Sequence, residues 1–231
     1  MKRFYKNAGF EPAANGWQAT LDDRPIRTQG GKQQIVPTET AARLLAQEWQ
    51  AQGDKIDPKS FFFRDLADFA IDIVHPRRAD TVGKLLSYAE TDTLCYRADP
   101  DEALYQRQQV VWEPIVQACE ACHGAVFERT SGILHRPQNP QTLAALRSRL
   151  ENEDEFTLSA LVTLASLAAS IIVPLSVIDR TAQVNHLFDA ANCEEDWQAE
   201  LWGWDELAQA TRKTRLEAFE KASQFAFAVR P

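Results

Sequence analysis

The pattern of hydrophobic and polar positions changes character near Pro37. Before that point, short strand-like runs at Trp17–Leu21, Arg24–Arg27 and Gln33–Val36 are separated by turn residues, Asp22-Asp23 and Gly30-Gly31. Short strands joined by tight turns predict a β-hairpin or meander. Because two or three strands are not stable alone, we expect this sheet to pack on another part of the chain.

From Pro37 onward the apolar positions recur at helical spacing. Thr38 is a candidate N-cap for a helix that ends before Gly53 and carries Trp49 on its buried face. Pro114 should kink or divide a later helix. Further helices are expected at 62–74, from Pro76, from Asp99-Pro100 to Cys122, from Asn139-Pro140 to Asn152, and at 205–229.

For two segments the sequence predicts more than the type of element. In the 62–74 helix, Leu66, Phe69, Ala70 and Ile73 should face inward, and Asp65, Asp68 and Asp72 outward. Residues 124–137, which include Ala125–Phe127 and Ile133–His135, are expected to be extended and to return to the N-terminal sheet.

The stretch from Phe156 to Ile178 carries no charged residue. Its length would suffice for a bilayer crossing. However, Ser and Thr residues interrupt it, acidic residues precede it, and no basic cluster flanks it. The stretch therefore predicts a buried core helix that other helices surround.

These elements predict an α+β fold, in which a small β-rich N-terminal domain packs against a larger all-helical C-terminal domain. The expected domains are residues 1–75, which include the first helices, and 76–231. The sequence contains no internal repeat.

Composition narrows the function classes. The 231 residues are 45% hydrophobic and include 25 Lys plus Arg against 33 Asp plus Glu, a formal charge of −8. Such values are typical of a globular protein, and the negative charge argues against a binder of nucleic acid or of anionic membranes. The start has no apolar leader, and the four Cys are expected to be reduced thiols, so a cytoplasmic protein is predicted.

The sequence contains few motifs that indicate catalysis or the binding of a metal or cofactor. Cys119-Glu-Ala-Cys122-His123 matches a haem-attachment signature, but Met1 is the only methionine and no export signal precedes the motif. A structural zinc site would need a second spaced pair of ligands, and Cys95 and Cys193 are isolated. We therefore expect no cofactor, no metal and no catalytic residues.

Several runs together resemble a known family. They are Arg3-Phe-Tyr-Lys6, Gly16-Trp17, Leu21-Asp-Asp-Arg-Pro-Ile-Arg-Thr28, Glu48-Trp-Gln-Ala-Gln-Gly53, Thr91-Asp-Thr-Leu-Cys-Tyr-Arg-Ala98, Arg107-Gln108 with Trp112-Glu-Pro114, and Trp197-Gln-Ala-Glu-Leu-Trp-Gly203. In order and spacing they resemble the chaperones that assemble the catalytic head of F-type ATP synthase, in their bacterial form.

The resemblance implies a non-enzymatic, ATP-independent chaperone that holds the unassembled alpha subunit of the ATP synthase until the beta subunit takes its place. It implies no nucleic-acid partner and no membrane insertion, and a monomer is expected. The alternatives are a structural subunit of some complex, or an enzyme without a recognisable motif. Asp23 departs from the family, which usually has Gly in that turn.

The resemblance also suggests where the client binds. The expected partner-binding residues are Trp197, Glu200, Trp202 and Asp205, and the family's acidic run is interrupted here by Trp204 and Leu207. Glu200 lies near a helix end that Gly203 terminates, where the helix dipole disfavours an acid. Either Glu200 contacts the client directly, or it forms a salt bridge with an Arg such as Arg212 or Arg215.

Overall fold

The structure is a computed structural model that describes residues 1–132 and 134–230. It divides into two compact units. The N-terminal unit comprises Met1–Arg78, Asp154–Ala160 and the chain from Gln224, and the helical unit comprises Ala79–Glu153 and Leu161–Ser223. The continuous domains expected from the sequence, 1–75 and 76–231, stay a prediction.

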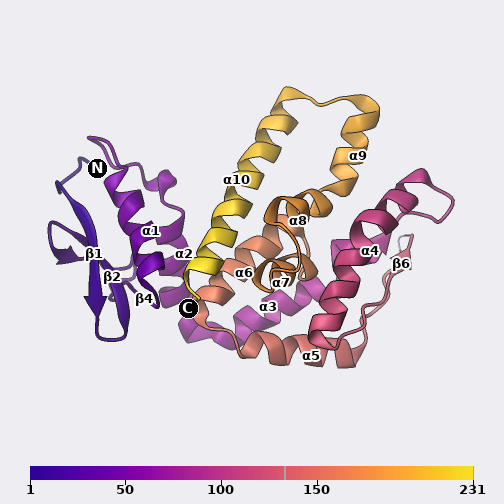
Figure 1. Ribbon diagram of the computed structural model, residues 1–231, viewed down its shortest axis with the longest axis horizontal. Coiled ribbons are helices and arrows are strands. Elements are labelled where there is room, and N and C mark those ends of the chain that lie inside the picture. Colours follow the sequence, from indigo (N-terminus) through magenta and orange to yellow (C-terminus); the bar gives the residue numbers. More distant parts are fainter. Residues whose placement is uncertain (133, 231) are drawn as a thin grey trace. The chain divides into compact units, whose positions relative to one another are not determined.

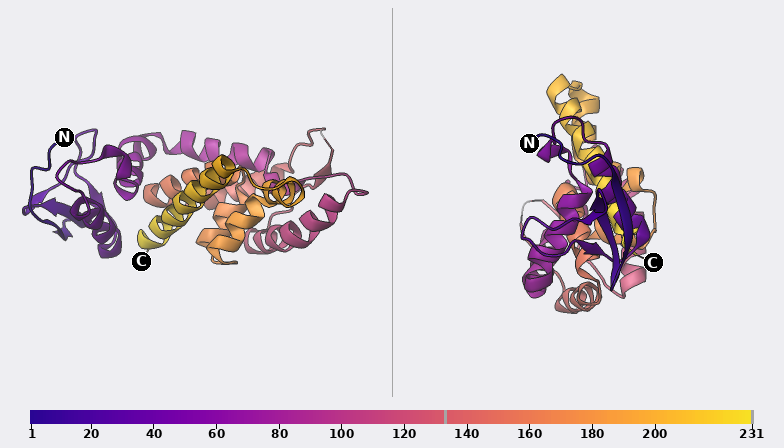
Figure 2. Two further views of the ribbon diagram at one scale, coloured as in Figure 1. Left: turned by 90° about the horizontal axis from the view of Figure 1, so that it is seen from above. Right: turned by 90° about the vertical axis from the view of Figure 1, so that its left-hand side faces the viewer.

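The N-terminal unit contains the expected small antiparallel sheet (Figures 1 and 2). Its strands are β1 (Ala8–Ala13), β2 (Gly16–Leu21), β3 (Arg24–Pro25) and β4 (Ile35–Val36), and β2 pairs with each of the other three. The β2–β3 turn places Asp22 and Asp23 at φ of 47° and 62°. Few residues other than glycine adopt that left-handed region readily, but Asp is among those that tolerate it.

Helix α1 (Glu39–Gln50) packs on β1 and β2 and begins as predicted. The Thr38 side chain accepts a hydrogen bond from the Ala41 N–H. Trp49 is buried, with 8% of its surface exposed, and its ring centroid lies 4.5 Å from that of Phe61 and 5.7 Å from that of Tyr5. The predicted burial of Trp49 is confirmed.

The helix expected at 62–74 consists of α2 (Phe63–Phe69) and one π-helical turn, Ala70–Val74. The predicted faces are partly wrong, because Ile73 is exposed whereas Asp68 is buried and Asp72 is mostly covered. The π turn changes the helical repeat at Asp72 and Ile73. Asp68 precedes this turn, and its burial is accompanied by hydrogen bonds from Gln29 and Gln34. Both carboxylates accept hydrogen bonds from the loop at residues 28–34.

The remaining helices are α3 (Arg78–Glu90), α4 (Ala103–His123), α5 (Pro140–Glu151), α6 (Glu155–Ala168), α7 (Ile172–Ile178), α8 (Val184–Ala191), α9 (Cys193–Trp202) and α10 (Glu206–Ala228). Short 3-10 turns lie at Pro58–Ser60, His75–Arg77 and Thr93–Cys95. An α+β protein with a small N-terminal sheet and a helical C-terminal region is thereby confirmed. The helices expected from Pro76, Asn139 and Asp205 are present, each within about three residues of the expected start.

Three details differ from the expectations. Helix α4 begins at Ala103 rather than at Pro100, and Pro114 does not divide it in two, whereas the expected kink stays a prediction. In the extended segment, β6 (Thr130–Ser131) pairs in parallel with β5 (Tyr96–Arg97) and not with the N-terminal sheet. The expected extended run at Ile133–His135 begins at a residue that lies outside the described part of the chain.

The uncharged stretch is buried as predicted but forms two helices, α6 and α7, rather than one. Ala169 separates them with a φ of 48°. The buried Asp92 carboxylate accepts hydrogen bonds from the Ser170 hydroxyl and from the N–H groups of Ile171 and Ile172. An acid at this position satisfies amides that the broken helix leaves unpaired. Within residues 1–132 and 134–230, no helix has the length and hydropathy of a membrane span.

Candidate functional site

Helix α9 of the helical unit and α10, whose residues from Gln224 belong to the N-terminal unit, form a hairpin (Figure 1). Trp197, Glu200 and Trp202 of the predicted site lie on α9, and Asp205 lies in the connection. Gly203 ends α9 at a φ of 86°, and its N–H donates to the Ala199 carbonyl at 2.8 Å. The Asp205 carboxylate accepts hydrogen bonds from the N–H groups of Leu207 and Ala208, both at 3.1 Å. These bonds make Asp205 the N-cap of α10.

Large apolar side chains around this connection are exposed. The exposed fractions are 57% for Leu201, 78% for Trp202, 40% for Trp204 and 74% for Leu207. We call these four residues the apolar tip. A single exposed apolar residue is ordinary, but four within seven consecutive positions, Leu201 to Leu207, are typical of a surface that binds another molecule.

The opposite side of α9 faces α4. Cys193, Trp197 and Glu200 follow one another at intervals of four and three residues, so they lie on one side of the helix. Arg107 of α4 binds both oxygens of Glu200, with Nη1 2.5 Å from Oε2 and Nη2 2.8 Å from Oε1. Its guanidinium carbon also lies over the Trp197 ring, 5.6 Å from the centroid. A single arginine therefore holds an acid and an aromatic ring of α9.

The contact between Arg107 and Glu200 shifts the pKa of both groups. The hydrogen bond from Arg107 lowers the pKa of the Glu200 carboxyl, and the same bond raises the pKa of Arg107. Glu200 remains exposed over 56% of its side chain. The carboxylate is thus ionised at neutral pH and open to solvent on one side.

A salt bridge of Glu200 was one of the two expectations, but the partners named for it are wrong. Arg212 instead binds Asp196, at 2.7 and 2.8 Å, and Asp189, at 2.9 Å. Arg215 binds Glu195 and Asn192. Both arginines lie on α10, whereas Glu200 faces α4.

The four predicted site residues therefore have different surroundings. Trp197 and Glu200 contact Arg107, Trp202 points into solvent, and Asp205 caps α10. Sequence reasoning did not assign Arg107 to the site, although its run belonged to the family resemblance. The exposed apolar residues Leu201, Trp204 and Leu207 were also missed, because Trp204 and Leu207 were seen only as interruptions of an acidic run.

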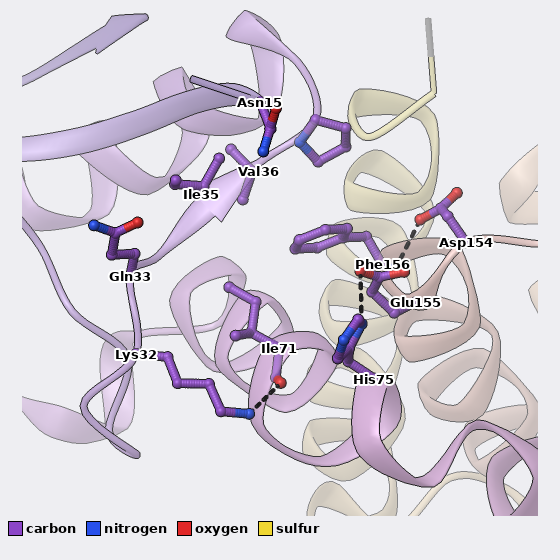
Figure 3. A pocket seen from close by; sticks show the side chains of 11 residues that line it. Asn15, Lys32, Gln33, Ile35, Val36, Ile71, His75, Asp154, Glu155 and Phe156 are labelled. Atoms are coloured by element: carbon purple, nitrogen blue, oxygen red, sulfur yellow. Dashed lines mark hydrogen bonds and ion pairs between the residues drawn. The ribbon is translucent and has the colours of Figure 1, made fainter. Parts of the chain in front are cut away.

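A pocket of about 610 Å³ lies in the N-terminal unit (Figure 3). Ile35, Ile71 and Phe156 contribute apolar walls, and the His75 Nδ1 lies 3.3 Å from the Glu155 Oε1. Lys32 donates to the Ile71 carbonyl at 2.9 Å. The Lys32, His75 and Glu155 side chains that line the pocket are thus already engaged in contacts within the protein.

The side chains of the Cys119-Glu-Ala-Cys122-His123 motif differ in burial. Cys119 is buried, and burial raises the pKa of its thiol, whereas Cys122 is exposed. The His123 side chain is only 5% exposed, with its Nε2 2.8 Å from the Asp179 Oδ2. In the part of the chain that the structure describes, no group of three or more His, Cys, Asp or Glu side chains could hold a metal ion.

An exposed apolar tip on a braced helical hairpin is typical of surfaces that bind another protein. Comparison with known proteins identifies the class. Residues 2–120 match the model of the family described as ATP12 chaperone protein, and the chain belongs to that family. This confirms the family of ATP synthase assembly chaperones that the sequence predicted.

Solved structures agree with this assignment. The chain is similar to Atp12 from Paracoccus denitrificans, with 35% identity, a TM-score of 0.93, and coverage of 99% of this chain and 98% of that one. A mutant of the same protein matches with the same values. The Atu1473 protein from Agrobacterium tumefaciens is 31% identical, with a TM-score of 0.94 and coverage of 99% of this chain and 86% of that one.

Proposed function

We propose that this protein binds the unassembled alpha subunit of F-type ATP synthase and releases it when the beta subunit takes its place. In this proposal the protein acts as a monomer in the cytoplasm, and it neither consumes ATP nor catalyses a reaction. Family membership supports a chaperone of ATP synthase assembly, and the choice of the alpha subunit comes from the family resemblance of the sequence.

The observation that carries the proposal is the apolar tip. Tryptophan supplies a large contact area at a small cost in conformational entropy, so it is enriched among the residues that dominate binding energy at interfaces. Trp202, at 78% exposed, is the most accessible of the four. A chaperone that covers an apolar subunit surface reversibly needs such a patch.

The proposed binding surface includes the four residues expected from the sequence. Trp202 is its central contact, Asp205 fixes the start of α10 beside it, and Trp197 and Glu200 lie on the adjoining side of α9. The surface is presented by two helix ends, which hold side chains more firmly than a long loop would.

A capture experiment with purified components tests the proposal. The tagged protein should retain isolated alpha subunit without nucleotide, suppress its aggregation, and lose it when beta subunit is added. Retention of beta subunit alone, or no retention of alpha subunit, would contradict it. Stable presence in the finished ATP synthase would instead favour the structural-subunit alternative.

The first variant prediction concerns the charge of Glu200. Glu200→Lys places two cations together where Arg107 now binds a carboxylate, so we expect it to abolish suppression of alpha-subunit aggregation. The melting temperature should change little, because the pair is exposed to solvent. Wild-type suppression by the variant would remove Glu200 from the proposed surface. Because the carboxylate already binds Arg107, this experiment does not separate direct contact with the client from support of α9.

A further inference from the structure

We propose that Arg107 is a positioning residue, which holds α9 in place through Glu200 and Trp197 and thereby presents the apolar tip. This inference rests on the proposed function, since it concerns how the client-binding surface is built. In it, Glu200 acts through Arg107 rather than on the client.

Arg107 contacts α9 through both Glu200 and Trp197. Arg107 binds Glu200 with two parallel hydrogen bonds of 2.5 and 2.8 Å and covers the Trp197 ring at 5.6 Å. Only the planar guanidinium fork can bind both carboxylate oxygens and lie over a ring at once, and a lysine cannot. The pair joins residues that are 93 positions apart in the sequence, so it fixes tertiary rather than local structure.

The contact between Arg107 and Glu200 lies at the C-terminal end of α9. The start of α9 has its own link to α4, because Gln108 donates to Glu194 at 2.7 Å. Arg107 binds the last turn, and Leu201 and Trp202 directly follow Glu200. Helix ends fray unless they are held, so the Arg107 contact restrains the turn that carries the tip.

Glu200 occupies an electrostatically unfavourable position at the end of α9. A carboxylate in the last turn of a helix is opposed by the helix dipole, and α9 has no basic residue in that turn. Arg107 supplies the missing positive charge from α4. An acid at this position is thus explained by its partner on α4, without a charge on the client.

The experiment exchanges the two charges. Capture of isolated alpha subunit and melting temperature are measured for wild type, Arg107→Ala, Arg107→Lys, Glu200→Lys, and the double variant Arg107→Glu with Glu200→Arg. Arg147→Ala is the matched control, because Arg147 forms an exposed pair with Glu151 on α5.

We expect Arg107→Ala and Arg107→Lys to weaken capture by about tenfold, the order of one charge-assisted bidentate contact. The double variant should regain most of the wild-type affinity, and Arg147→Ala should match wild type. Tryptophan emission should change in Arg107→Ala, because Trp197 loses the cation over its ring.

Two results would overturn the inference. One is wild-type capture by Arg107→Ala. The other is a double variant that melts like wild type but captures as poorly as Glu200→Lys, because that outcome assigns the carboxylate to the client. Failure of wild type itself to capture alpha subunit would count against the proposed function and is distinguishable from both.

Discussion

At the residue scale, buried carboxylates account for several differences between the predicted and observed structures. Asp68, Asp72 and Asp92 were expected in solvent or were not assigned, since acids are seldom buried unless they have partners. Asp92 accepts hydrogen bonds from three backbone N–H groups and the Ser170 hydroxyl. One of these donors, the Leu94 N–H, is local, but Ser170, Ile171 and Ile172 lie almost 80 positions away, so the local pattern could not reveal them.

A prediction of pH dependence follows for Asp92. Burial raises the pKa of its carboxyl from 3.8 to about 6. The folded protein therefore keeps a proton that the unfolded chain has already released, and the contribution of Asp92 to the free energy of unfolding decreases as pH rises from about 4 to about 6. The slope from this group is at most about 1.4 kcal/mol per pH unit, and it vanishes above that window.

Urea unfolding of wild type and Asp92→Asn across this range measures the effect. The asparagine cannot ionise, so the difference in unfolding free energy between wild type and variant should shrink with rising pH below about 6 and stay constant above. A difference that is constant from pH 4 to 8 would show that Asp92 does not titrate there.

A prediction of stability concerns Trp49. Its ring packs on Tyr5 and Phe61, so Trp49→Ala should lower the free energy of unfolding by about 3–5 kcal/mol. Chemical denaturation measures the loss. Trp202→Ala is the control, because that side chain is exposed and should cost less than about 0.5 kcal/mol. Unchanged stability with weakened capture would make Trp49 a binding residue instead.

At the element scale, the sequence predicted helices best where a local signal marks an end. Thr38 and Asn139 cap α1 and α5 as expected, and Gly203 ends α9. These positions depend on residues within one turn, which a single sequence displays. The break between α6 and α7 depends instead on Asp92, and the short β5–β6 pair depends on tertiary packing.

The candidate site shows the same division between local and distant causes. Its location in the Trp197–Asp205 stretch was suggested by the family resemblance, and the helical spacing explains why Trp197 and Glu200 share a side while Trp202 does not. The partner of Glu200 could not be predicted, because Arg107 is brought to α9 by the packing of α4. Arg212 and Arg215 are nearer in sequence but bind other acids.

At the scale of the whole molecule, charge is divided unequally between the two units. The helical unit carries 21 Asp and Glu against 12 Lys and Arg, a formal charge of −9. The N-terminal unit carries 12 acidic and 13 basic residues, a formal charge of +1. The negative field therefore belongs to the unit that bears the apolar tip, and it favours a client surface with positive charge.

The last prediction concerns salt. If the field of the helical unit guides the client toward the apolar tip, the association rate of alpha subunit should fall by about tenfold between about 50 and 500 mM NaCl, while the dissociation rate changes less. Stopped-flow fluorescence or surface-based kinetics measures both rates. Neutralising the exposed Glu206 and Glu217 of α10 should reduce the salt dependence, whereas neutralising Glu11 of the N-terminal unit should not.

An association rate that is independent of salt would mean that the apolar tip alone selects the client and that the acidic residues serve solubility. Equal effects of the α10 and Glu11 variants would mean that total charge, rather than its location in the helical unit, sets the rate.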